Sequence, residues 1–257
     1  MKLYHQIKQL LCKILSRGIV LLAFWVMPHN AMAGELVFVT DHYPPYEFMD
    51  KNNTPTGFDV DVLMAAFARL EIPIRIELRP WKRAVDDTRL GKVTGMFSCS
   101  KTPGREKFAH YSDVLSQTTP SLIVKKSTYE GSKSPNLEDM RKMTIGVIAG
   151  YSHAAELRAE NVPVVDIPEV SYGLTMLMGD RFTGFHMGRE TGLYMAAQAG
   201  LADKVSVIPI GDQPRLPFHL CFSKKVPGYK ELAAKFNKAL KLMRQNGELD
   251  AIYAKYR

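Results

Sequence analysis

Residues 97–106, FSCSKTPGRE, connect a predicted strand to a predicted helix. The apolar run at residues 93–97 is typical of a strand and ends in small hydroxyl residues. Thr102 followed by Pro103 is typical of a helix N-cap with proline at the first helical position. Arg105 then falls in the first helical turn, where the partial positive charge of the helix end favours carboxylates by roughly 0.3–1 kcal/mol. An arginine in this place therefore needs a compensating anion.

The same residues supply groups that can hold such an anion. Backbone N–H groups, the hydroxyls of Ser98 and Ser100 and the guanidinium of Arg105 converge on one place. We therefore expect half of a carboxylate-binding site here. The residues alone leave an alternative open, in which Arg105 forms a surface ion pair with Glu106 or Asp113.

Residues 1–33 have the pattern of a cleavable secretory signal peptide. Four basic residues and no acidic residue precede Glu35, an apolar run covers residues 18–27, and Ala31-Met32-Ala33 forms an A-x-A cleavage site. The apolar run is shorter than the roughly 20 residues that a membrane span needs. We expect cleavage after Ala33 and export of the mature chain to the periplasm.

The charge and the cysteines limit the possible functions. Removing the four basic residues of the leader lowers the formal net charge from +8 to +4, without a basic run that would indicate nucleic-acid binding. Cys12 lies in the leader, so Cys99 and Cys221 remain, and they either form a disulfide or lie separately buried on strands. No cluster of cysteine and histidine has zinc spacing, so we expect no metal and no cofactor.

The mature chain is expected to be α/β, with two lobes. Strand and helix patterns alternate in both halves, which predicts parallel sheets with ligands at the carboxyl ends of their strands. The predicted strands cover residues 35–40, 74–78, 93–97, 143–148, 162–167, 182–187 and 205–210. The predicted helices cover residues 57–70, 81–90, 154–159, 171–178 and 191–199, followed by two helices with an apolar stripe near the end of the chain.

Two extended segments join the lobes in this prediction. They cover residues 116–126 and 216–224 and indicate a hinge beside a cleft. Lobe I is expected to comprise residues 34–119 and 214–257, and lobe II residues 120–213. Nothing in the sequence indicates oligomerisation, so we expect a monomer.

Residues 57–62, GFDVDV, resemble the signature of the family 3 extracellular solute-binding proteins, the periplasmic components of polar amino-acid ABC transporters. Further similar pieces, spread over essentially the whole mature chain, are YPPYE at 43–47, PWKR at 80–83, SKTPGR at 100–105 and NGEL at 246–249. The resemblance implies the bilobal periplasmic-binding-protein type II fold. It also implies capture of an amino acid or related small carboxylate between the lobes and delivery to an inner-membrane permease. Phe67 departs from the pattern, because the family usually has a smaller residue there.

The resemblance implies ligand-binding roles in both lobes. Arg105 matches the arginine that holds the ligand's carboxylate, assisted by Ser98 and Ser100. The other matching positions are Asp41, Tyr43, Tyr46 and Trp81 in lobe I, and Tyr151, Ser152 and His153 in lobe II. Two of these have other readings: Tyr46 as packing beneath its loop and His153 as a surface capping residue.

One position differs from the family in a way that bears on the ligand. Family members usually bind the ligand's ammonium with an acid just after the strand at 182–187, and here that position is Gly188. A buried ammonium without a carboxylate is costly. Either Glu190 or Asp41 replaces the missing acid, or the ligand is not an ordinary α-amino acid.

Three functions remain open at this stage. The first is a periplasmic binding protein that serves a permease, and a dicarboxylate or another organic anion would suit Arg105 together with Arg189 or His186 as its ligand. An enzyme is an alternative to a transport protein, since cyclohexadienyl dehydratases resemble this family, although Glu190, Asp41 and His186 form no recognisable acid–base pair. A third possibility is a sensory module that reports its ligand to a membrane receptor.

Overall fold

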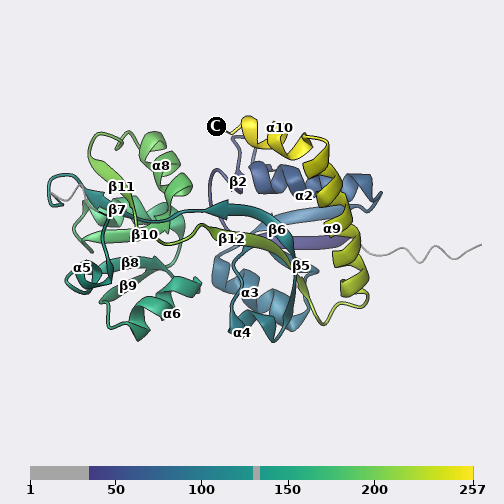
Figure 1. Ribbon diagram of the computed structural model, residues 1–257, viewed down its shortest axis with the longest axis horizontal. Helices are drawn as coiled ribbons and strands as arrows, with labels where there is room; N and C mark the ends of the chain where they lie inside the picture. Colours follow the sequence, from purple (N-terminus) through teal and green to yellow (C-terminus); the bar gives the residue numbers. More distant parts are fainter. Residues whose placement is uncertain (1–34, 130–133, 257) are drawn as a thin grey trace, which may run out of the picture. The chain divides into compact units, whose positions relative to one another are not determined.

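The computed structural model describes residues 35–129 and 134–256 (Figure 1). The predicted leader and its cleavage site lie outside these residues. In the described ranges, no helix combines the length and the apolar character that a membrane crossing requires.

The first sheet contains strands from both ends of the described chain. Its strands β1, β4 and β5 run parallel, and β12 is antiparallel to both β5 and β6. The order across the sheet is β4 (Ile74–Leu78), β1 (Leu36–Thr40), β5 (Gly95–Cys99), β12 (Leu216–Ser223) and β6 (Ala109–Thr118). We call this sheet and its helices the first lobe; the helices are α2 (Phe58–Arg69), α3 (Trp81–Leu90), α4 (Pro103–Glu106), α9 (Tyr229–Gln245) and α10 (Glu248–Ala254).

The second sheet is formed by the middle of the chain. The order is β11 (Val205–Pro209), β7 (Pro120–Lys125), β10 (Gly184–Gly188), β8 (Ile145–Ile148) and β9 (Val164–Ile167). With its helices it makes the second lobe; these are α5 (Leu137–Arg141), α6 (Ser152–Ala159), α7 (Gly173–Met178) after the short turn η1 (Val170–Tyr172), and α8 (Arg189–Gln198). The predicted two-lobe α/β fold is confirmed.

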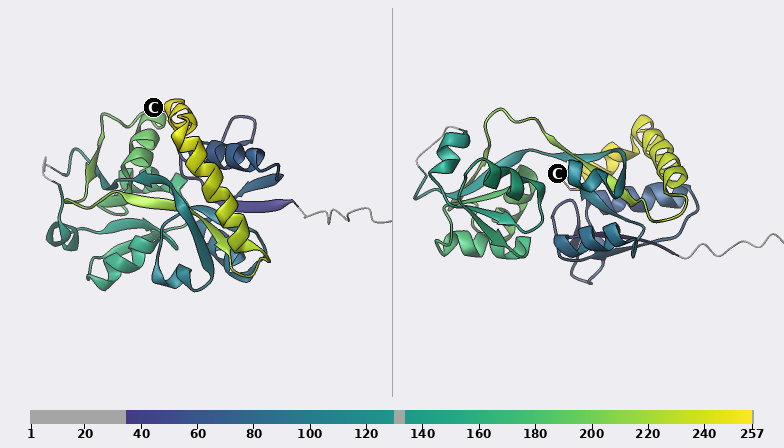
Figure 2. Two further views of the ribbon diagram at one scale, coloured as in Figure 1. Left: turned by 45° about the vertical axis from the view of Figure 1, so that its right-hand side comes forward. Right: turned by 90° about the horizontal axis from the view of Figure 1, so that it is seen from below.

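Two neighbouring segments pass from one sheet to the other. Strand β6 is followed after Thr119 by β7, and β11 is followed by β12. The segments are joined where they cross, because Leu216 of β12 pairs with Thr118 of β6 (Figures 1 and 2). We refer to residues 116–120 and 215–217 as the crossing strands. Their position sets the carboxyl ends of β1 and β5 opposite the second lobe.

Most predicted elements are found within a few residues of their expected bounds. Helix α3 and strand β4 have the predicted ends, and Gly91 closes α3 in the left-handed conformation, with φ of 75°. Strand β5 was predicted at residues 93–97 but covers Gly95–Cys99. The hydrophobicity pattern ended the strand too early, because Ser98 and Cys99 are buried and Cys99 pairs with β12.

Two small elements were not predicted. Helix α5 begins with a capping box between Asn136 and Asp139, a signal that is readable in the sequence. A hairpin of β2 (Phe48–Met49) and β3 (Pro55–Thr56) precedes α2, and its strands are too short for a periodic pattern to reveal.

The first-lobe core explains two features of the sequence. Phe67 of α2 is fully buried between Phe38 and Phe236, with ring centroids 5.0 and 5.5 Å away, so the larger residue at this position fills the core. Cys99 and Cys221 are free, buried thiols on the neighbouring strands β5 and β12. Of the two alternatives for the cysteines, the structure therefore shows the unpaired one.

A pair of buried carboxyl groups ties β5 to α2 and β6. The Ser98 hydroxyl lies 2.6 Å from Glu47 Oε2 and 2.7 Å from Asp59 Oδ2, while Thr40 donates to Glu47 and Ser116 to Asp59. Ser98 has one hydroxyl proton and can donate it to only one of the two groups, so the other contact requires a proton on a carboxyl group. Burial raises the pKa of Glu47 well above its ordinary value, and that of Asp59 to about 7.

These raised pKa values predict that stability falls with rising pH. An unfolded carboxyl group loses its proton near pH 4, whereas Asp59 in the folded protein keeps it up to about pH 7. The folded state binds more protons over this range, so the free energy of unfolding should decrease from pH 5 to pH 8. Urea titrations at several pH values give the slope of the free energy of unfolding against pH. This slope should be smaller in Asp59→Asn than in the wild-type protein. Asp86→Asn, at a partly exposed site on α3 where the side chain pairs with Arg89, should keep the wild-type slope. An equal slope in all three proteins would contradict the prediction.

Candidate functional site

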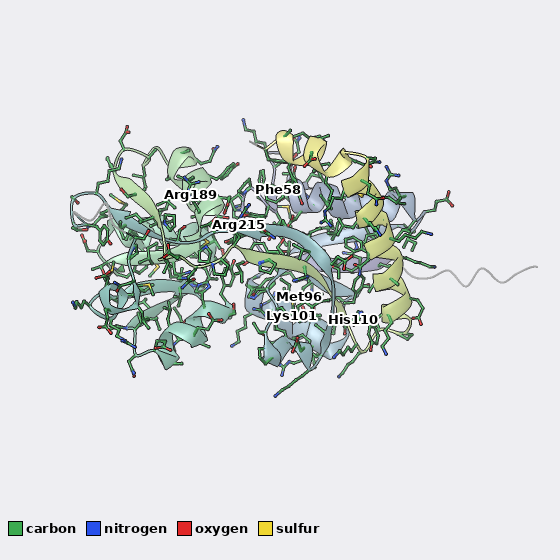
Figure 3. All side chains as sticks on the ribbon, in the orientation of Figure 1. Phe58, Met96, Lys101, His110, Arg189 and Arg215 are labelled. Atoms are coloured by element: carbon green, nitrogen blue, oxygen red, sulfur yellow. The ribbon has the colours of Figure 1, made fainter. Side chains whose placement is uncertain are left out.

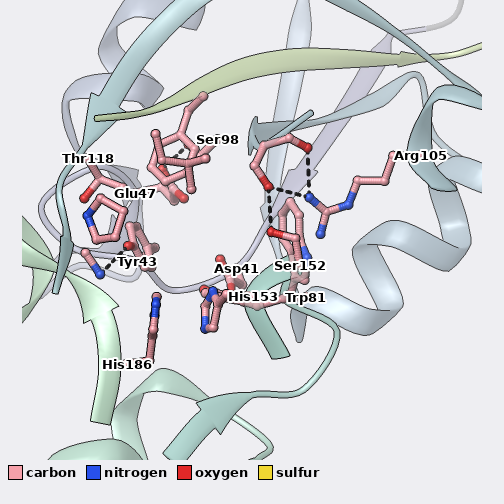
Figure 4. Close-up of a pocket in the computed structure, with 16 residues that line it drawn as sticks. Asp41, Tyr43, Glu47, Trp81, Ser98, Arg105, Thr118, Ser152, His153 and His186 are labelled. Carbon is pink, nitrogen blue, oxygen red and sulfur yellow. Dashed lines mark hydrogen bonds between the residues drawn. The ribbon is translucent and has the colours of Figure 1, made fainter. Parts of the chain in front are cut away.

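A small cavity lies between the carboxyl ends of β1 and β5 and the second lobe (Figure 4). Its free volume is about 50 Å³, which is enough for only a few water-sized groups. Residues from both lobes line it. Those that were expected at a ligand site are Asp41, Tyr43, Trp81, Ser98, Ser100, Arg105, Tyr151, Ser152 and His153.

Arg105 is held in place by the local structure that the sequence predicted. Thr102 caps α4 by accepting a hydrogen bond from the Arg105 backbone N–H, and Pro103 occupies the first helical position. The Arg105 side chain is buried and lies over the Trp81 ring, 5.2 Å from its centroid. Its guanidinium donates to the carbonyl and hydroxyl oxygens of Ser100, at 2.9 and 2.8 Å, and to the Gly150 carbonyl, at 3.2 Å.

The surface ion pair that the sequence left open for Arg105 is not formed. Glu106 instead lies 3.3 Å from the Lys101 ammonium, and Asp113 binds Asn237 through its backbone N–H. Among the described residues, no acidic side chain forms an ion pair with Arg105. A buried guanidinium that has only neutral acceptors retains a strong preference for an anion.

Three hydrogen bonds close the cavity between the lobes. Tyr151 donates to Asp41 at 2.7 Å, the hydroxyls of Ser100 and Ser152 are 3.3 Å apart, and Arg105 reaches Gly150 as described. Burial raises the pKa of Asp41 to about 6, although the bond from Tyr151 and the charge of Arg105 act in the opposite direction. These contacts use the polar groups that a ligand would otherwise bind.

Aromatic rings form much of the cavity wall. Tyr43 lies with its ring centroid 6.1 Å from that of Tyr151 and 5.9 Å from that of Phe218, and Trp81 packs edge-on against Tyr151. Trp81 also belongs to the apolar core beneath α3, together with Ala84. Trp81 therefore lines the cavity and also packs in the first-lobe core.

The position of the missing acid is filled by neighbouring side chains. Gly188 donates its backbone N–H to the Tyr43 hydroxyl at 3.1 Å. A Cβ atom at this position would lie 2.1 Å from Thr118 Oγ1 and 2.4 Å from the Tyr43 hydroxyl oxygen. No carboxylate side chain can occupy position 188 unless both neighbours move.

Two expected site residues lie outside the cavity lining. Tyr46 is fully buried and donates its hydroxyl to the Gln117 carbonyl, so the structure places it in the packing role that was left open. Glu190 turns towards the crossing strands, where it accepts hydrogen bonds from Thr118 and Thr119 and pairs with Arg215. Glu190 is therefore not positioned to replace the missing acid in the cavity.

Arg189 is also directed away from the cavity. Its backbone N–H donates to the Thr119 carbonyl, and its side chain is not among those that line the cavity. Figure 3 shows Arg189 and Arg215 beside the crossing strands. Of the two residues considered as second partners for an organic anion, His186 alone lines the cavity.

Two histidines stack within the cavity wall. The rings of His153 on α6 and His186 on β10 are 3.9 Å apart and nearly parallel, at 18°. The Nε2 atom of His153 and the Nδ1 atom of His186 are buried and have no hydrogen-bond partner in the described part of the chain. Burial lowers the pKa of His186 to about 4 and that of His153 well below its ordinary value, with the charges of His186 and Arg105 adding to the effect on His153. Both rings are therefore neutral at pH 7.

Several lining residues were not expected from the sequence. Four of them reach the cavity from a loop, from the crossing strands and from the adjoining part of β12: Glu47, Thr118, Leu216 and Phe218. Glu47 lies within the YPPYE motif, which was a usable signal. The others are brought together only by the pairing of β6 with β12.

Comparisons with known proteins agree with the fold. The putative ABC transporter arginine-binding protein 2 of Escherichia coli (strain K12) is 22% identical over 88% of this chain and 93% of its own length. The probable histidine-binding protein of Neisseria gonorrhoeae is 23% identical over 83% of this chain and 79% of its own length. A solved structure of an ancestral arginine-binding protein bound to glutamine superimposes with a TM-score of 0.77 and 25% identity, covering 88% of this chain and 98% of that one.

The family assignment rests on the whole described chain. The model of the bacterial extracellular solute-binding proteins, family 3, matches residues 36–257, a range that includes both sheets, both crossing strands and the cavity. The chain therefore belongs to the bacterial extracellular solute-binding proteins, family 3.

Proposed function

We propose that this protein captures a small carboxylate between its lobes in the periplasm and delivers it to an ABC transporter permease. The observation that carries the proposal is the buried guanidinium of Arg105, which faces a cavity lined from both lobes. Its hydrogen-bond acceptors within residues 35–129 and 134–256 are neutral oxygens of Ser100 and Gly150. Relatives named for amino-acid binding and ABC transport support it. The leader pattern of residues 1–33 supports export.

Binding couples to lobe closure in this proposal. A ligand carboxylate would replace Gly150 and Ser100 as the acceptors for Arg105, because a charge-assisted hydrogen bond is stronger than a neutral one. The free volume of about 50 Å³ requires the lobes to separate during loading. Bending of the crossing strands permits this, and contacts from both lobes to the ligand then favour the closed state.

We propose binding in preference to catalysis. Of the three groups considered as an acid or a base, Glu190 lies outside the cavity and Asp41 is engaged by Tyr151. His186 is stacked on His153, and its pKa of about 4 makes it a poor base at neutral pH.

Removal of the Arg105 guanidinium is expected to weaken ligand binding strongly. Arg105→Ala should weaken the affinity for the ligand by about 2–5 kcal/mol, since the bound carboxylate would be left buried without its partner. The ligand is first identified by thermal-shift screening of amino acids, dicarboxylates and aromatic acids, and affinities are then measured by calorimetry. Arg83→Ala, an exposed arginine on α3, is the matched control. Unchanged affinity in Arg105→Ala would refute the proposed site.

Trp81 is expected to act in both stability and binding. Because it is 5% exposed and packs in the core beneath α3, Trp81→Ala should lower the free energy of unfolding of the ligand-free protein by about 3–5 kcal/mol. Trp81→Phe keeps a ring over Arg105 and should lose less stability and less affinity. Melting temperatures without ligand, followed by calorimetry, separate the two effects. An unchanged melting temperature in Trp81→Ala would show that the core contact contributes little.

A further inference from the structure

We infer that the ligand carries a second anionic group, bound by the stacked His153–His186 pair, and that it lacks the α-ammonium of an amino acid. The ligand class is then a small dicarboxylate, with one carboxylate on Arg105 and the other on the histidines. This inference rests on the proposed function and names the ligand of the same site.

The first argument is that the position of the family's usual ammonium-binding acid is blocked, and that the acids in the lining already accept hydrogen bonds from the protein. Position 188 is filled by the Tyr43 hydroxyl and Thr118. Asp41 is the partner of Tyr151, and Glu47 is held by hydroxyl groups at both of its oxygens. The acids that line the cavity are therefore bonded to the protein's own hydroxyls.

The second argument is the unmet hydrogen-bonding capacity of the histidines. A buried polar atom without a partner costs about 1–3 kcal/mol, so such atoms in a cavity wall indicate a missing partner. Both rings line the cavity (Figure 4). In each ring, one buried nitrogen has no partner among the residues that the structure describes. A carboxylate accepts a hydrogen bond from the N–H group of a neutral imidazole and forms an ion pair with a protonated imidazole.

The third argument is the charge around the pair. Arg105 and Asp41 face the cavity with opposite charges, and Tyr43 and Tyr151 are neutral neighbours. The charge of Arg105 opposes protonation of His153 in the closed protein. The negative charges of such a ligand would offset the positive charge of Arg105, which opposes protonation of His153. Binding should therefore be accompanied by uptake of a proton by the histidine pair. Stacking at 3.9 Å allows only one of the rings to become charged.

The test compares matched probes on the full mature chain. Succinate, butyrate, aspartate and glutamine differ in the second carboxylate and in the ammonium, and calorimetry at pH 6, 7 and 8 gives the affinities. We expect succinate to bind at least tenfold more tightly than butyrate, aspartate or glutamine at pH 6. Its affinity should fall by up to tenfold for each pH unit between 6 and 8. A preference for glutamine or aspartate would overturn the inference.

Variants identify the group that binds the second carboxylate. His153→Phe and His186→Phe keep a stacked ring and remove the nitrogens, so each should reduce succinate affinity at least tenfold and flatten its pH dependence, with butyrate affinity unchanged. His110→Phe, outside the cavity, is the matched control. Melting temperatures establish that each variant folds, and if one histidine variant fails to fold, the other decides.

The outcomes separate this inference from the proposed function. If Arg105→Ala abolishes binding of an amino acid that the histidine variants bind normally, the carboxylate site stands and the dicarboxylate inference is wrong. If Arg105→Ala has no effect on any probe that binds, the proposed function itself is wrong. A pH dependence that disappears in Asp41→Asn and persists in both histidine variants would assign the proton to Asp41 and would also overturn the role of the pair.

Discussion

The site depends on one buried charge, the guanidinium of Arg105, which forms no ion pair with a carboxylate of the described residues. The guanidinium is satisfied by oxygens of Ser100 in its own lobe and by the Gly150 carbonyl of the other lobe. Since Gly150 comes from across the cavity, the bond that compensates for the missing anion also draws the lobes together. The same N–H groups of Arg105 thus hold the closed form and would bind the ligand. They form stronger hydrogen bonds with a carboxylate than with a neutral carbonyl.

Three buried acids lie in or beside the cavity wall, and in the described part of the chain none of them forms an ion pair with Arg105. Burial raises the pKa of Glu47, Asp59 and Asp41, and hydroxyl groups bind their oxygens. Ser98 lies between two of these acids in the left-handed conformation, with φ of 52°, which is uncommon for a residue with a side chain. The protons retained by Glu47 and Asp59 keep the negative charge of these two acids low. Asp41, whose pKa is about 6, is the acid that carries charge at pH 7.

The sequence predicted the parts of the fold that depend on local signals. The helix at Trp81–Leu90 ends at Gly91, and Thr102 and Pro103 begin α4, because capping and backbone preferences act between near neighbours. The directions of side chains at the site were less accessible. Glu190 is two residues from Gly188, yet it turns to the crossing strands, since its partners, Thr118 and Thr119, lie about seventy residues away along the chain. That contact depends on where the crossing strands lie, which local sequence signals do not give.

At Gly188, the sequence and the structure each explain part of why an acid is missing. The sequence shows that the acid is absent, and the structure shows that the space is taken, because Tyr43 and Thr118 stand where a Cβ atom would lie. A carboxylate side chain could occupy this position only if both neighbours moved, so the three positions depend on one another. The crossing strand that supplies Thr118 also binds Glu190, which fixes α8 and the end of β10 against it. The geometry that joins the lobes thus also excludes the usual partner of an ammonium group.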